Sequence, residues 1–112
     1  MAATETDPRI QRFQTMISRF PDRPEPRFSL ARALQDAGDH AAALLHYEKA
    51  SELQADFMMA WLHRAECLME LDRLPEAADA AARSRELAVA QGHTGPREEA
   101  DELLAEIADL TG

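Results

Sequence analysis

Apolar residues recur every three or four positions along most of this chain, in segments separated by short breaks. The first segment shows this spacing in Ile10, Phe13, Ile17 and Phe20. The last segment shows it in Ala100, Leu103, Leu104, Ile107 and Leu110. Such spacing places the apolar side chains on one face of an α-helix. The pattern therefore predicts an N-terminal helix over residues 7–20 and a C-terminal helix over residues 96–110.

Glycine, proline and aspartate mark the breaks between the predicted helices. The main breaks are Pro21-Asp22, Gly38-Asp39, Asp72 to Pro75, and Gly92. Because each break is only a few residues long, consecutive helices are expected to be antiparallel neighbours. Pro26 is expected to open a helix, since proline is tolerated in a first turn. Residues 1–6 show no apolar periodicity, and we expect them to be disordered.

The middle of the chain repeats its own apolar order after 34 residues. Ala31, Leu34, Ala43 and Leu53 are followed at that offset by Ala65, Leu68, Ala77 and Leu87. A period of this length indicates one supersecondary unit used twice, at 24–57 and 58–91. Each unit is too short to bury its own apolar face and must stack on a neighbour. The predicted fold is an all-α stack of antiparallel helix hairpins in a single domain, 1–112, with the C-terminal helix as its cap.

The composition favours helices and restricts the partners. Val89 is the sole valine, so a sheet has little β-branched material. The net charge is −9, from 21 acidic and 12 basic residues. Such a surface repels phosphate backbones and anionic lipids, which argues against nucleic acid and membrane partners. The single cysteine, Cys67, excludes an intramolecular disulfide, and we expect the chain to be cytoplasmic.

The two units resemble the tetratricopeptide repeat family. The second unit carries the family's apolar pattern in Trp61, Ala65, Leu68 and Ala77. The first carries it in Leu30, Ala31, Leu34, Gly38, Ala43, Tyr47 and Ala50. Each unit departs from the pattern, since Arg27 stands in the tryptophan position and Asp72 in the turn-glycine position. The chain is thus similar to small bacterial two-repeat members of the family, and the resemblance implies a protein-binding scaffold without a cofactor.

The resemblance also implies where a partner binds, because the first helix of each repeat lines the concave face in this family. The outward residues of these helices are Glu25, Phe28, Ser29, Arg32, Gln35, Asp36, Met59, Leu62, His63, Glu66, Met69 and Glu70. Among them the expected partner-binding residues are Phe28, Arg32, Met59, Leu62, His63 and Met69. Flexible methionines in a groove accept apolar side chains of a partner helix or extended segment. The predicted function is non-catalytic binding of a peptide segment or partner subunit.

Two alternatives use the same residues differently. In the first, a second copy of the chain covers the apolar strip, which gives a homodimer or another homo-oligomer. In the second, His63 and Cys67, four residues apart on one helix, hold a metal or form a thiol-dependent enzyme site. Because no second His/Cys pair exists in the sequence, burial of Cys67 as a small core residue is the favoured interpretation. We therefore expect no enzyme activity, no cofactor and no metal.

Overall fold

The computed structural model describes residues 7–112, and over this range the chain consists of helices without strands. The helices are α2 (Pro8–Arg19), α3 (Pro24–Asp36), α4 (His40–Leu53), α5 (Met58–Glu70), α6 (Leu74–Gln91) and α7 (Thr94–Thr111). The all-α prediction is confirmed. The expected disorder of residues 1–6 concerns positions outside the described range. No helix in residues 7–112 is long and apolar enough to cross a lipid bilayer.

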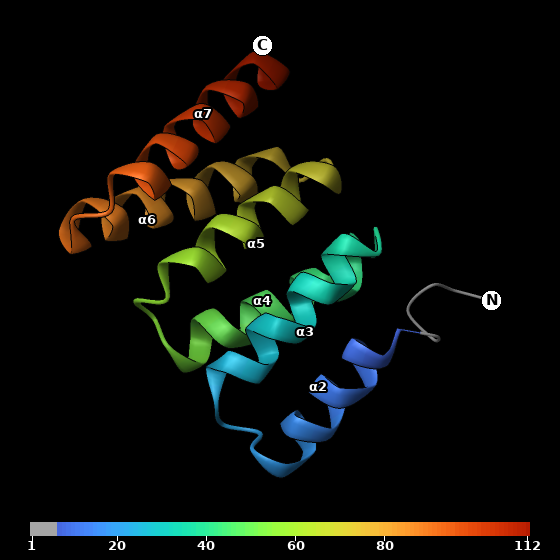
Figure 1. Cartoon of the computed structure of the whole chain (residues 1–112). Helices are drawn as coiled ribbons and strands as arrows, with labels where there is room; N and C mark the ends of the chain where they lie inside the picture. Colours follow the sequence, from blue (N-terminus) through green and yellow to red (C-terminus); the bar gives the residue numbers. More distant parts are fainter. Residues whose placement is uncertain (1–6) are drawn as a thin grey trace.

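Successive helices pack against one another in chain order, as Figure 1 shows. Helices α3 and α4 form one hairpin and α5 and α6 form the next, and the two hairpins meet where α4 packs on α5. Helix α2 packs on α3 at one end of the stack, and α7 packs on α6 at the other (Figure 1). The chain is therefore two stacked hairpins with one additional helix at each end.

Local sequence signals explain where several helices begin. The Asp7 carboxylate accepts a hydrogen bond from the backbone N–H of Arg9, and Asp39 accepts one from Ala42. Both are N-cap bonds, which satisfy backbone donors that a first helical turn leaves open. The expectation that Pro26 opens a helix is wrong, because α3 begins two residues earlier, at Pro24. Both prolines fit inside the first turn, where the missing N–H has no helical acceptor.

Alanine and leucine supply most of the core that joins the hairpins. A large cluster runs from Ile10 in α2 to Ile107 in α7, and a smaller one contains Met58, Leu87 and Ala88. Trp61 packs against both clusters. The many buried alanines let neighbouring helix backbones approach closely. A single connected core therefore extends through the stack from one end helix to the other.

Helix α7 covers the far side of α6 as a cap. Its side chains Ala100, Leu103 and Ile107 are buried against the stack, with exposed fractions of 7 % or less. Leu110 was expected on the same buried stripe, but it is 58 % exposed because it lies in the last turn of α7. The helix begins at Thr94, two residues before the predicted start.

Candidate partner-binding surface

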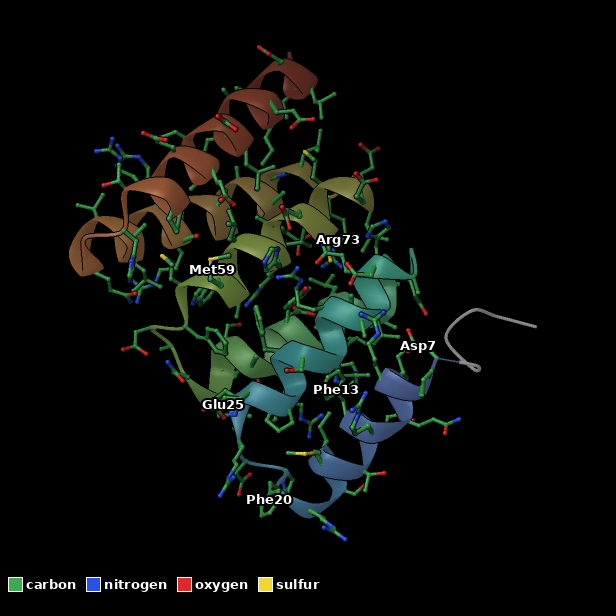
Figure 2. The ribbon with its side chains drawn as sticks, in the orientation of Figure 1. Asp7, Phe13, Phe20, Glu25, Met59 and Arg73 are labelled. Atoms are coloured by element: carbon green, nitrogen blue, oxygen red, sulfur yellow. The ribbon has the colours of Figure 1, made fainter. Side chains whose placement is uncertain are left out.

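Helices α3, α5 and α7 share one face of the stack, because each is the first helix of a unit. Side chains of α3 meet side chains of α5 directly across this face, and a hollow joins α5 to α7. Figure 2 labels Glu25 near the start of α3 and Met59 on α5. We call this surface the A-helix face, and it contains the residues expected to bind a partner.

An aromatic group lies at the centre of the A-helix face. The ring of Phe28 stacks on Phe57 with centroids 4.7 Å apart, and it meets Tyr47 edge-on at 5.7 Å. The imidazole of His63 lies 5.8 Å from the Phe28 ring and 5.7 Å from the Tyr47 ring. Phe28 and His63 are half-buried, whereas Tyr47 is fully buried. The first repeat, the second repeat and the turn between them thus contribute to one aromatic cluster.

A chain of polar contacts runs beside these rings and ties α3 to α5. The Arg32 guanidinium lies 3.3 Å from Nε2 of His63, and Nδ1 of His63 lies 2.5 Å from a Glu66 carboxylate oxygen. The Gln35 amide donates to the same Glu66 oxygen at 3.1 Å, and its carbonyl accepts from the Tyr47 hydroxyl at 2.6 Å. Since a guanidinium only donates, Nε2 of His63 must accept. In this arrangement Nε2 of His63 accepts from Arg32, and the Nδ1–H of His63 donates to Glu66.

The surroundings of this network shift the pKa values of Glu66 and Tyr47 in opposite directions. Burial of Glu66 would raise its carboxyl pKa, but the hydrogen bonds from His63 and Gln35 outweigh burial and lower the pKa below its ordinary value. Burial raises the pKa of the Tyr47 hydroxyl well above its ordinary value. At neutral pH the network therefore contains a carboxylate and a neutral phenol. Arg32 is the exposed cation at its outer end.

The structure places the expected anchors at different depths. Leu62 is only 1 % exposed, so the expectation that its side chain is an exposed anchor is wrong. Leu62 belongs to the large core cluster and forms the floor of a hollow between α5 and α7. Met59 and Met69 are half-buried and pack against the core. Arg32 is exposed on the A-helix face, whereas Phe28, Met59, His63 and Met69 keep only part of their surface accessible.

Two adjoining hollows lie between α2 and α3. The larger, about 430 Å³, is lined by Phe13, Met16, Asp22, Arg23, Pro24, Glu25, Pro26 and Ser29. The smaller, about 260 Å³, is lined by Arg9, Phe13, Phe28, Ser29, Arg32, Ala33 and Asp36. Phe13 and Ser29 belong to both linings, so the two hollows adjoin, and we call them together the groove between α2 and α3. Figure 2 shows Phe13 on the side of α2 that faces α3.

A third hollow, of about 280 Å³, lies between α5 and α7 and is strongly acidic. Its floor is Leu62 and Leu103, and its walls are Glu66, Glu99, Glu102 and Glu106. Within residues 7–112 the three α7 carboxylates of this wall make no ion pair of 4 Å or less. The A-helix face thus changes from arginine-containing near α2 to acidic near α7.

Cys67 is buried and separate from the polar network. Its side chain has an exposed fraction of 0 %, and burial raises the pKa of its thiol to about 12. A thiol of this pKa is almost entirely protonated at neutral pH, and the thiol is neither a nucleophile nor a good metal ligand in that form. The favoured interpretation of Cys67 as a buried core residue is confirmed. Among residues 7–112 no group of three His, Cys, Asp or Glu side chains is arranged to hold a metal ion.

Sequence reasoning missed two parts of this surface. Phe57, in the turn before α5, stacks on Phe28 although it lies outside the first helices. The glutamates of α7 join the A-helix face because α7 occupies the position of a first helix in a third unit. The place of the α7 glutamates could have been predicted from the sequence, since the alternation of first and second helices already assigns α7 to the first-helix position of a third unit. The position of Phe57 depends on the path of a turn, which periodicity does not predict.

The comparisons with known proteins identify the fold. No family model matches the sequence, and no curated protein matches it significantly. PcrH in complex with the chaperone binding region of PopD superposes with a TM-score of 0.87 and 22% identity, over 92% of this chain and 78% of the other. The TPR2B domain of yeast Sti1, in a complex with pHsp70, gives 0.85 and 19%, over 90% and 81%.

A tetratricopeptide repeat domain protein from Salinibacter ruber also superposes, with a TM-score of 0.72 and 24% identity, over 78% of this chain and 97% of the other. At these identities the likeness shows the fold alone. The chain therefore has a tetratricopeptide-like fold, and the resemblance predicted from its residues is confirmed at that level.

Proposed function

We propose that this chain is a non-catalytic interaction module that binds a peptide segment of a partner protein on its A-helix face and in the adjoining hollows between α2 and α3. The observation that carries the proposal is the groove between α2 and α3, which leads to exposed Arg32 beside the half-buried ring of Phe28. A concave apolar surface with a few placed polar groups is the usual form of a recognition site. Two of the similar structures, PcrH with a region of PopD and Sti1 with pHsp70, are themselves complexes with a partner segment.

Each accessible residue has a distinct role in this proposal. Phe28 and Met59 offer apolar contact to a side chain of the partner. Arg32 pairs with an acidic group of the partner, because its guanidinium is exposed and contacts an imidazole rather than a carboxylate in the described part of the chain. His63 positions Arg32 and is itself held by Glu66. Met69 contributes at the margin of the surface.

The proposal is non-catalytic because neither candidate reactive group is available. The Cys67 thiol is buried, and both ring nitrogens of His63 have partners within the chain. A nucleophile needs an accessible thiolate or a base at hydrogen-bond distance. The thiol-enzyme alternative therefore has no support in the arrangement of these residues.

Selection from a displayed library of random peptides, with the immobilised chain as bait, tests the proposal. We expect selected peptides to contain an apolar residue near an acidic one, matching Phe28 and Arg32. The affinity of these peptides is then measured by fluorescence anisotropy for the chain and for Arg32→Glu. Charge reversal at a direct ion pair is expected to weaken binding by about tenfold or more, because it replaces attraction with repulsion.

Lys49→Glu is the matched control, because it reverses an exposed charge on α4, a second helix of the stack. We expect this control to leave the peptide affinity unchanged. If selected peptides bind equally to the chain and to Arg32→Glu, they bind elsewhere and the proposal is wrong. If no peptide is selected and light scattering shows a homodimer that Arg32→Glu dissociates, a second copy occupies the face instead.

A further inference from the structure

The two end helices of the stack are each half of a repeat unit. Helix α2 packs on α3 as α4 packs on α5, so α2 has the position of a second helix. Helix α7 packs on α6 as α5 packs on α4, so α7 has the position of a first helix. Residues 7–112 include no first helix to pair with α2 and no second helix to pair with α7. Figure 1 shows these two helices at opposite ends of the stack.

The surface of α2 differs from that of α4, its counterpart in the next unit, because residues 7–112 contain no first helix of the same unit to pack against α2. Met16 lies 34 residues before Ala50, which is fully buried in α4, yet Met16 is 40 % exposed. Phe20, one turn further, is also 40 % exposed. Exposed large apolar side chains beside each other mark an interaction surface more often than a solvated one.

The charges of the two end helices are opposite. Helix α2 contains three arginines and no acidic residue, whereas α7 contains six acidic residues and one arginine. Arg12 and Arg19 are exposed and make no ion pair in the described part of the chain. Glu98, Glu102 and Asp109 are exposed and equally unpaired there. In a chain with net charge −9, a helix that carries only positive charges is a local exception.

The spacing of these charges also matches. Arg12 and Arg19 are seven residues apart, as are Glu102 and Asp109. Seven residues are about two helical turns, or about 10 Å, so each pair projects from one side of its helix. Glu102 borders the α5–α7 hollow that Leu103 also lines, and Asp109 lies two turns further along the exposed part of α7, with the small side chain of Ala105 between them. Two packed helices can therefore align both charge pairs at once.

We propose that a second copy of this chain docks end to end, with its α2 against α7 of the first copy. The contact joins a second helix without a partner to a first helix without a partner, and so builds a complete hairpin between two chains. Met16 and Phe20 lie against the alanine-containing side of α7, and Arg12 and Arg19 pair with its carboxylates. Because the two surfaces differ, the contact is heterologous, and a copy bound at one end can bind another at its other end. Met16 also lines the larger hollow between α2 and α3, so the docked copy and a bound peptide share this side chain, whereas Arg12 and Arg19 belong to the docking contact alone.

Two charge-reversal variants of the 112-residue chain test the proposal. One variant, Arg12→Glu/Arg19→Glu, lacks the docking charges of α2 but keeps α7. The other, Glu102→Arg/Asp109→Arg, lacks those of α7 but keeps α2. Sedimentation velocity measures the mass of each chain over a range of concentrations, at about 0.02 M and about 0.5 M salt, between which ionic screening changes strongly.

We expect the unaltered chain to exceed 12.5 kDa as its concentration rises at low salt, and to dissociate at high salt. Each variant alone is expected to remain a monomer. An equimolar mixture is expected to associate again beyond 12.5 kDa, because intact α2 of one variant meets intact α7 of the other, and the two reversed surfaces also carry opposite charges. Circular dichroism melts check that both variants fold, which we expect since all four side chains are exposed.

The mixture separates this contact from other forms of association. If the Glu102→Arg/Asp109→Arg variant dimerises by itself, α2 pairs with α2 and the proposal is wrong. If the unaltered chain is monomeric at every concentration and salt, no end contact forms and the proposal is likewise wrong. Neither result affects the peptide test, because Arg32 lies outside both altered surfaces.

Discussion

Gly38 and Asp72, which lie 34 residues apart, have the same left-handed backbone conformation with different side chains. Their φ angles are 83° and 60°, and each lies just after the end of a first helix. The following residue, Asp39 or Arg73, donates a backbone hydrogen bond back into that helix at 2.9 Å. A left-handed φ is easy for glycine and costs an L-residue about 1–2 kcal/mol, somewhat less for aspartate. The second repeat therefore contains strain that the first does not.

We predict that Asp72→Gly stabilises the chain by about 0.5–1 kcal/mol, because relief of the left-handed strain exceeds the added flexibility of the unfolded chain. Gly38→Ala is the reciprocal change and should destabilise by about 1 kcal/mol. No atom lies within 4 Å of the Cβ that this change would add, so its cost comes from the backbone alone. Urea denaturation measures both changes. If Asp72→Gly is destabilising, the Asp72 side chain contributes more than its strained backbone costs.

His46 introduces a pH dependence at the residue scale. Burial, together with the nearby charge of Arg27, lowers the pKa of its ring below the ordinary 6.5. The folded chain therefore favours the neutral ring, and the stability due to this preference is complete above about pH 6.5. It is lost as the pH falls from 6.5 toward the lower pKa of the folded state, because the unfolded chain binds the proton more readily.

We predict that His46→Gln makes the melting temperature less sensitive to pH below about 6.5, because the titrating ring is gone. Thermal melts followed by circular dichroism between pH 7.5 and the acid limit of reversibility, about 5, would measure this. His93→Gln is the same substitution at an exposed histidine in the turn before α7, and its profile is measured for comparison. A profile of His46→Gln that coincides with the unaltered chain would contradict the assigned role of the ring.

At the scale of the elements, the helices differ in how firmly they are held. The central helices α3 to α6 have neighbours on two sides, whereas α2 buries only Ile10 fully and α7 buries only Ala100, Leu103 and Ile107. Helices of this length gain most of their stability from packing an apolar face rather than from intrinsic propensity. The end helices are therefore the ones whose apolar contacts decide whether they remain docked.

We predict that Leu103→Ala destabilises the chain by about 2–4 kcal/mol, because it removes a buried leucine of α7 that forms part of the floor of the α5–α7 hollow. Leu110→Ala is the matched control on the same helix. Its side chain is 58 % exposed, and its removal should cost less than about 0.5 kcal/mol. Urea denaturation compares the two. Equal effects would mean that α7 packs in a different rotation from the one described.

At the scale of the whole molecule, charge is graded along the stack. The stack measures 39 × 31 × 20 Å, with arginine-rich α2 and acidic α7 at opposite ends. Exposed charges farther apart than about 10 Å are largely screened in ordinary salt, so the two ends do not attract each other within one chain. The gradient therefore matters for contacts with other molecules. In the docking proposed above it orients a second copy at the ends, and in the proposed peptide site it distinguishes the two parts of the A-helix face.

The sequence by itself determined the class of fold, the order of its helices and their antiparallel stacking. Periodic apolar residues, the 34-residue repeat and short breaks each constrain local structure, so they can be read along the chain. Gly38 and the N-cap Asp39 illustrate this, since both act on backbone within a few residues. The burial of Cys67 also followed, because its position in the repeat is one that small core residues occupy.

The tertiary structure alone decided which outward-facing residues stay accessible. Leu62 lies at the edge of the α5 face, and its burial depends on how closely α6 and α7 approach it. The stacking of Phe57 on Phe28 depends on the path of a turn, and the tautomer of His63 depends on Arg32 from another helix. The burial of Leu62 and the stacking of Phe57 on Phe28 therefore each depend on several elements together. Helical periodicity places a residue on a side of its own helix, whereas the neighbouring helices determine what covers that side.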